Sequence, residues 1–315
     1  MKRLLQLLIV PVLLFPFSVL QSAHLSYVHG FGEKNREKSA SFYYEKFGSQ
    51  DGGYSMVIVP DEAGQISSAV FYTQPAVEAV INDWHQRVCI EKNDSLIVVG
   101  YSCGGGTVIN SLAKLVEYAA CDGSKGCFDG TAIQSAQQAQ EIIDAINNGA
   151  IVLNAPLLDV KKIRKITDLS LLLKAGTRMA ATFTIAYSCG LTIGNAILLD
   201  CVLQCVIGSH IQKMYAAAIA RFYLPRRTNG HFDPTYSSPL KSIDALRGKF
   251  SCPMLLHFNK NDGVVADSDE DTQKLCDAIE NKKTHVLIST DAHHEKSSKQ
   301  FVRALEMFKS HYFGE

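Results

Sequence analysis

The sequence has no surplus of charge of either sign, since 31 Lys and Arg residues balance 31 Asp and Glu residues among its 315. Without a net positive field, the protein is not expected to be a general nucleic-acid binder. It also lacks Pro- or Ser-rich linkers and internal repeats, and Gly and Pro contribute only 22 and 9 residues, which excludes collagen and a mainly disordered chain. Hydrophobic residues make up 47%, so we expect a folded chain with a sizeable core.

The cysteines lack the spacing of a structural zinc site. No pair has the CxxC spacing, and the nine cysteines are scattered, mostly in apolar segments. We interpret most of them as small buried hydrophobic residues, and we predict no metal and no other cofactor. Cys121 and Cys127 bracket a flexible Asp-Gly-Ser-Lys-Gly stretch that can close a disulfide loop in an oxidising compartment. The odd number leaves at least one thiol unpaired in an exported chain.

The N-terminal residues 1–23 have the pattern of a secretory signal peptide. Lys2 and Arg3 precede the uncharged apolar stretch Leu4–Leu20, and small residues follow at Ser22 and Ala23. Cleavage after Ala23 would leave a Gln where a small residue is preferred, so an uncleaved N-terminal anchor is the alternative. We expect export to the periplasm or the outside, with membrane association left open.

Short β-branched runs alternate with helical patterns along the rest of the chain. This order predicts an α/β fold, in which a mostly parallel sheet carries helices on both faces. The predicted strands are Leu25–Val28, Tyr54–Val59, Leu96–Val99, Ile151–Leu153, Met254–Phe258 and Thr284–Ile288. The predicted helices are Gln74–Val88, Gly105–Ala119, Gln134–Asn147, Ser268–Ile279 and Ser297–Phe313.

The third predicted strand leads directly into a GxSxG motif, Gly100-Tyr101-Ser102-Cys103-Gly104, and then into a helix. A strand, a sharp turn and a helix form the setting in which such a serine acts as a nucleophile. Gly100 and Gly104 are small because the turn brings strand and helix into close contact. The alternatives are a Gly-rich turn with an inert serine or a phosphate-binding loop, but no Walker lysine follows. We predict Ser102 as the nucleophile.

With this motif, the chain from about Leu25 to Phe313 resembles the α/β-hydrolase superfamily, apart from a large insert. His29-Gly30-Phe31-Gly32 follows the first predicted strand and is similar to the oxyanion loop of the family. The resemblance implies that the backbone N–H groups of Phe31 and Cys103 stabilise the negative charge of the reaction. The alternative for this segment is an ordinary Gly turn after a strand.

The resemblance also implies the other two members of a catalytic triad. Asp262 follows the strand Met254–Phe258, where the family places its acid, with Asp267 as a nearby rival. The segment Asp291-Ala292-His293-His294 precedes the last helix, where the family has its histidine. It favours His294, with His293 as the alternative. Histidine would deprotonate Ser102, the serine would attack an acyl carbonyl, and water would release the acyl group.

A second serine has similar neighbours. Ser188 lies in Ala186-Tyr187-Ser188-Cys189-Gly190, which imitates the motif around Ser102. No strand precedes it, and it belongs to a long apolar helical pattern, so we expect it to be a packing residue.

The segment 159–228 divides the predicted hydrolase core into residues 24–158 and 229–315. It contains ten Lys and Arg residues against three Asp residues, and Met179–Leu199 carries no charge. A single membrane crossing here would separate Ser102 from Asp262, and a double crossing would leave each helix near the minimum length of roughly 17 residues and bury Asp200. We therefore predict a helical lid that packs on the core. Basic residues beside apolar surface favour an anionic lipid surface. The alternative is that the apolar stretch is internal packing and that the basic face is solvated.

We therefore predict a serine hydrolase that cleaves carboxylic or thio esters, resembling lipases and esterases and acting on a lipid or long-acyl substrate. One alternative is a peptidase or amidase on the same fold. The other is a non-catalytic protein of this fold that binds a membrane or a partner through the insert.

Overall fold

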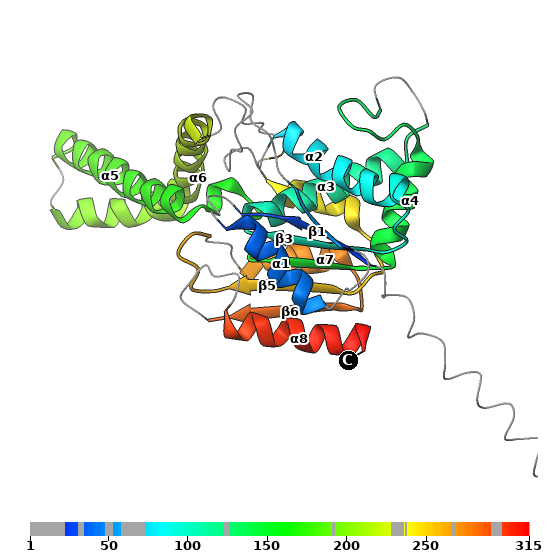
Figure 1. The fold of residues 1–315 in the computed structure, drawn as a ribbon. Coiled ribbons are helices and arrows are strands. Elements are labelled where there is room, and N and C mark those ends of the chain that lie inside the picture. Colours follow the sequence, from blue (N-terminus) through cyan, green and yellow to red (C-terminus); the bar gives the residue numbers. More distant parts are fainter. Residues whose placement is uncertain are drawn as a thin grey trace, which may run out of the picture.

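A computed structural model gives the fold of the protein (Figure 1). It describes residues 23–30, 35–47, 53–57, 73–122, 127–190, 193–227, 236, 238–265, 269–290 and 298–314. Of the predicted signal peptide or anchor, only Ala23 lies within the described residues, and export stays a prediction.

A six-stranded parallel sheet forms the centre of the molecule, in the order β2-β1-β3-β4-β5-β6. The inner strands β1, β3 and β4 are fully buried, which agrees with their nearly continuous apolar sequences. The strands are β1 His24–Val28, β2 Tyr54–Val57, β3 Leu96–Tyr101, β4 Ala150–Asn154, β5 Met254–Asn259 and β6 Thr284–Ser289. Each predicted strand coincides with one of these, although the last two residues of Tyr54–Val59 lie outside the described residues.

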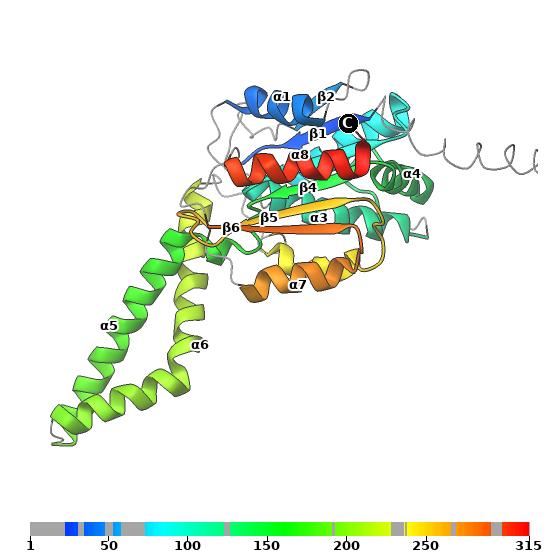
Figure 2. The same ribbon diagram turned by 90° about the horizontal axis from the view of Figure 1, so that it is seen from below.

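Helices cover both faces of the sheet (Figure 2). On one face, α1 and α8 pack their aromatic side chains, including Tyr43 and Phe301, against β1 and β5. On the other face, α2, α3, α4 and α7 enclose the larger part of the core. Their bounds are α1 Arg36–Phe47, α2 Gln74–His85, α3 Cys103–Ala119, α4 Ala136–Asn147, α7 Asp269–Ile279 and α8 Lys299–Phe313. The predicted fold class, α/β with a parallel sheet covered on both faces, is confirmed.

Serine and threonine caps determine where several helices begin. The side chains of Thr73, Ser135 and Ser298 accept hydrogen bonds from the third backbone N–H that follows each of them. The helices α4 and α8 therefore begin just after a capping serine, two residues later than predicted. The helix α2 passes into a π-helix, Gln86–Ile90. The helix α1, whose exposed face is highly charged, was not predicted from the sequence.

Two long helices between β4 and β5 form an antiparallel hairpin, α5 Arg164–Ser188 and α6 Ile193–Arg227. We call residues 164–227 the arm. The arm projects away from the core over most of its length and meets the core at its root (Figures 1 and 2). The sequence predicted lid helices packed on the core, and the projecting arm differs from that prediction. A lid function stays a prediction.

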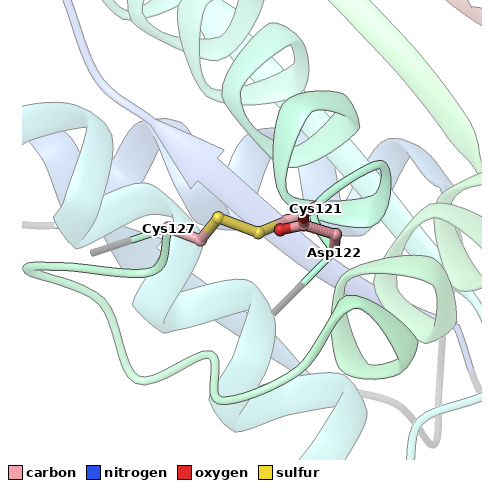
Figure 3. A group of neighbouring side chains, drawn as sticks. All are labelled: Cys121, Asp122 and Cys127. Atoms are coloured by element: carbon pink, nitrogen blue, oxygen red, sulfur yellow. A yellow bond between two sulfur atoms is a disulfide. The ribbon is translucent and has the colours of Figure 1, made fainter. Parts of the chain in front are cut away.

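A disulfide joins Cys121 and Cys127 after the end of α3, and Figure 3 shows it beside Asp122. This is the pair that the sequence spacing indicated. Because both sulfur atoms are bonded to each other, the two cysteines and Asp122 do not offer a thiolate site for a metal ion.

Candidate active site

Ser102 lies at the sharp turn between β3 and α3, as the sequence predicted for a nucleophile. Its backbone has φ 54° and ψ −122°, a conformation that costs free energy for a residue with a side chain. The Ser102 N–H donates to the Asn154 carbonyl at 2.9 Å, and the Ser102 carbonyl accepts from the Leu157 N–H at 3.0 Å. The segment after β4 thus holds the strained turn in place. The side chain is 4% exposed.

The glycines of the motif are required by close backbone contacts. A Cβ atom at Gly104 would lie 2.2 Å from the Val28 carbonyl oxygen and 2.5 Å from that of His29. A Cβ atom at Gly100 would lie 2.7 Å from the Cα atom of Gly105. The strand, the turn and the helix therefore pack backbone against backbone around Ser102.

Gly104→Ala is expected to lower the free energy of unfolding by about 3 kcal/mol, because the added methyl group meets carbonyl oxygens that cannot move independently. The measurement is urea unfolding followed by circular dichroism. Gly176→Ala is the matched control: it lies within α5, nothing lies within 4 Å of its added methyl group, and alanine favours the helix. Equal stability of Gly104→Ala and wild type would show that the turn is not packed as described.

The loop after β1 approaches Ser102, as expected for an oxyanion loop. A Cβ atom at Gly30 would lie 3.2 Å from the Cβ atom of Ser102 and 2.7 Å from the Tyr101 ring. His29 is buried, and its Nδ1 lies 2.9 Å from the Gly30 carbonyl oxygen, to which it donates in the Nδ1–H tautomer. Cys103 is the first residue of α3, so its backbone N–H belongs to the positive end of that helix. Phe31 and Gly32 lie outside the described residues.

Asp262 is buried in the turn after β5. Its Oδ1 accepts hydrogen bonds from the backbone N–H groups of Val264, at 2.7 Å, and Val265, at 2.9 Å. These two bonds fix the orientation of the carboxyl group. Since β4 separates β3 from β5, Ser102 and Asp262 follow strands that are about 10 Å apart. Both residues therefore lie at the same edge of the sheet, at the carboxyl ends of parallel strands.

His293, His294 and the rival acid Asp267 all lie outside the described residues. The described residues nevertheless join the start of the histidine segment to the acid turn. The Lys260 N–H donates to the Ser289 carbonyl at 3.0 Å, and the Asn261 side chain donates to the Thr290 carbonyl at 2.8 Å. The chain therefore leaves β6 beside Asp262, immediately before the two histidines.

A buried polar network beneath the site was not predicted from the sequence. The Asn154 side chain donates to the Tyr43 hydroxyl at 2.8 Å, and its carbonyl oxygen lies 2.7 Å from His257 Nδ1. His257 Nε2 lies 2.8 Å from the Ser289 hydroxyl. The sequence signal was the presence of Asn, His and Ser at or near the ends of otherwise apolar strands. Such a network joins the ends of β4, β5 and β6 to α1, and thus supports the segments that carry Ser102 and Asp262.

A small pocket of about 30 Å³ adjoins the acid turn. Its lining includes Asp262, Val265 and Pro156, and Pro156 contacts Gly105 in the first turn of α3. The pocket therefore lies on the side of the candidate acid that faces the first turn of α3, the helix that follows the candidate nucleophile.

Other nucleophilic side chains are poorly placed for this chemistry. Burial raises the pKa of the Cys89 thiol to about 11 and that of Cys252 to about 12, so both thiols stay protonated near neutral pH. Ser188 is the last residue of α5, as predicted for a helical serine, but it is exposed and not a packing residue. Ser188 thus has ordinary helical surroundings and no strand-to-helix turn.

Comparisons with known proteins return similar structures but no similar sequences. No protein-family model matches the chain, and neither does any curated protein. A lipase-esterase related protein from Clostridium acetobutylicum has 14% identity and a TM-score of 0.45, with 91% of this chain and 94% of that chain covered. A monoacylglycerol lipase from Paleococcus ferrophilus has 14% identity and a TM-score of 0.46, with the same coverage. A proline iminopeptidase from Mycobacterium smegmatis has 13% identity and a TM-score of 0.43, with 93% and 91% covered.

Similarities at this level do not identify an activity. The parallel sheet, the strained serine between β3 and α3, and a buried aspartate after β5 occur in the chain order that the resemblance implied. In these features, the described part of the chain has the architecture of the α/β-hydrolase fold.

Proposed function

We propose that this protein is a serine hydrolase that cleaves carboxylic or thio esters through an acyl-enzyme on Ser102. The observation that carries the proposal is the backbone of Ser102, which adopts φ 54° and ψ −122° between a buried strand and a helix. A packed core maintains such strain where it serves a function, and here the strained residue is a serine at a strand-to-helix turn.

In the proposed reaction, His294, or His293 in its place, takes the proton of the Ser102 hydroxyl while the Ser102 oxygen attacks the acyl carbonyl. Asp262 orients the imidazole and stabilises its positive charge. The backbone N–H groups of Cys103 and Phe31 donate to the developing oxyanion. The imidazolium then protonates the leaving alcohol or thiol, and a water molecule, activated by the same histidine, releases the acid. The proposal requires no metal and no cofactor.

We further propose a lipid or long-acyl ester as the substrate. The support comes from the root of the arm, which packs apolar side chains beside the candidate site. Ile166 and Ala216 of the arm share an apolar cluster with Cys103 and Val265. An acyl chain that reaches Ser102 would approach next to this apolar cluster.

A substrate series tests the proposal directly. We expect hydrolysis of p-nitrophenyl esters, with kcat/KM rising from acetate to decanoate, and hydrolysis of an acyl thioester. A decanoyl p-nitroanilide of the same acyl length is the matched control and should be cleaved far more slowly. Preferred cleavage of the anilide would assign the protein to amidases or peptidases. No cleavage of any member by the folded protein would favour the non-catalytic alternative.

A further inference from the structure

The arm has the reverse of the polarity expected of a helical hairpin in water. A soluble pair of helices normally buries its apolar side chains between the helices and exposes its polar ones. In the arm, polar side chains meet between α5 and α6. Arg178 donates to Asp200 at 2.8 Å and to Gln204 at 2.7 Å. Lys174 donates to Gln212 at 3.5 Å, and Thr177 forms a hydrogen bond with Tyr215.

Large apolar side chains lie on the outside of the arm. On α5, Leu172, Phe183 and Tyr187 are 70%, 60% and 91% exposed. Together with Leu169 and Met179, they follow the three- and four-residue spacing of one helix face. On α6, the exposed apolar side chains include Ile197, Leu198, Val202 and Met214. An ordinary protein surface exposes large apolar side chains singly, whereas here several of them share one helix face, which indicates an apolar environment.

The charges of the arm are sorted along its length. Lys165 and Arg221 are exposed near the root. Toward the tip, Met179–Leu199 contains no charged residue, and the next acid, Asp200, is paired with Arg178. A basic root and an apolar tip with paired polar groups inside match the order of anionic headgroups and hydrocarbon in a membrane.

We propose that the arm docks this protein on an anionic lipid surface, with the tip of α5 and α6 inserted into one leaflet. From Arg178 to Ser188, α5 extends by about 15 Å at 1.5 Å per residue, which is about half of the ~30 Å hydrocarbon layer. In the part of the chain that the structure describes, no helix has the length and apolar character needed to cross a bilayer. The docking does not depend on the proposed hydrolysis, because it concerns a different surface.

Tryptophan fluorescence tests the docking at the arm itself in the full chain. The chain has one Trp, and it is the fully buried Trp84, so a Trp introduced by Phe183→Trp reports on the arm. We expect phosphatidylglycerol vesicles with brominated acyl chains to quench this Trp, and unbrominated ones to shift its emission to the blue. Met307→Trp is the matched control, because Met307 is 65% exposed on α8, and its emission should stay unchanged.

Two lysines near the start of the inserted part test the charge dependence. Lys174 lies one helical turn from Arg178 and contacts Gln212, and the neighbouring Lys213 is exposed. Lys174→Gln combined with Lys213→Gln should weaken vesicle binding by about 30-fold, since each basic residue near an anionic surface contributes a factor of about five. Phosphatidylcholine vesicles should bind the arm much more weakly than phosphatidylglycerol vesicles.

Two results would overturn the proposal. The first is an unchanged emission of Phe183→Trp on anionic vesicles, even if the protein binds these vesicles through its apolar N-terminal residues. The second is a blue shift that appears without lipid and rises with protein concentration, together with a dimer in sedimentation velocity. That result would assign the arm to a second copy of the chain.

Discussion

Ser102→Ala is expected to lower kcat for p-nitrophenyl ester hydrolysis by about 10⁵- to 10⁶-fold, because the acyl-enzyme can no longer form. Alanine has no hydroxyl group to attack the carbonyl. It keeps the backbone contacts of the turn, including the Ser102 N–H bond to Asn154 at 2.9 Å. The fold and the rest of the site should therefore remain intact, which circular dichroism and thermal unfolding can verify.

Ser188→Ala is the matched control for this change. Ser188 has nearly the same neighbours in the sequence, but it lies exposed at the end of α5. Its replacement should leave kcat within twofold of wild type. If Ser102→Ala retained more than about a tenth of the wild-type rate while Ser188→Ala lost it, the nucleophile would be misassigned.

Asp262→Asn is expected to lower kcat by about 10⁴-fold, because the amide cannot stabilise the imidazolium and favours the wrong tautomer of the histidine. The substitution is nearly isosteric. Its carbonyl oxygen can still accept from the Val264 and Val265 N–H groups that hold the wild-type carboxylate. The loss should therefore appear in kcat while the folded structure is retained.

Variants of two other aspartates distinguish the loss of the catalytic acid from a general loss of negative charge. Asp269 lines the same pocket and is exposed, so Asp269→Asn should change kcat by less than twofold. Asp267 is the rival acid from the sequence. A 10⁴-fold loss in Asp267→Asn with an active Asp262→Asn would transfer the acid role to Asp267.

The sheet was predictable because its strands have short, nearly continuous apolar sequences that are separated by longer helical patterns. A short, nearly continuous apolar sequence between helical patterns fits few structures other than a parallel strand that is buried on both faces. The turn at Ser102 was predictable for a different reason. Gly100 and Gly104 are needed where backbones touch, and the structure shows both contacts below 3 Å for an added Cβ atom.

Other features depended on contacts between distant parts of the chain. The helix α1 has a weak periodic pattern, and it is held by aromatic packing against α8 and β1. The link between Asn154 and His257 joins two strands that are about a hundred residues apart in the sequence. The polarity of the arm could not be predicted either, because the sequence of an apolar helical stretch is the same whether its apolar face is buried or exposed.

The root of the arm contacts the candidate site through hydrogen bonds as well as apolar packing, which gives the two proposals a common structural basis. Arg164, the first residue of α5, donates from its side chain to the Asp262 carbonyl at 3.1 Å and from its backbone N–H to the Val264 carbonyl at 2.8 Å. A movement of the arm root would thus reach the acid turn directly. With the tip inserted as far as Arg178, the helix from Arg164 to Arg178 would hold the root of the arm about 20 Å from the hydrocarbon.

Covalent capture tests the central claim most directly. The full-length protein is treated with a fluorophosphonate, which bonds to an activated serine without any knowledge of the substrate, and the adduct is located by peptide mass spectrometry. The account predicts one adduct per chain, on Ser102, and none in Ser102→Ala. An adduct on another serine, or no adduct on the folded wild-type protein, would contradict the assignment of Ser102 as an activated nucleophile.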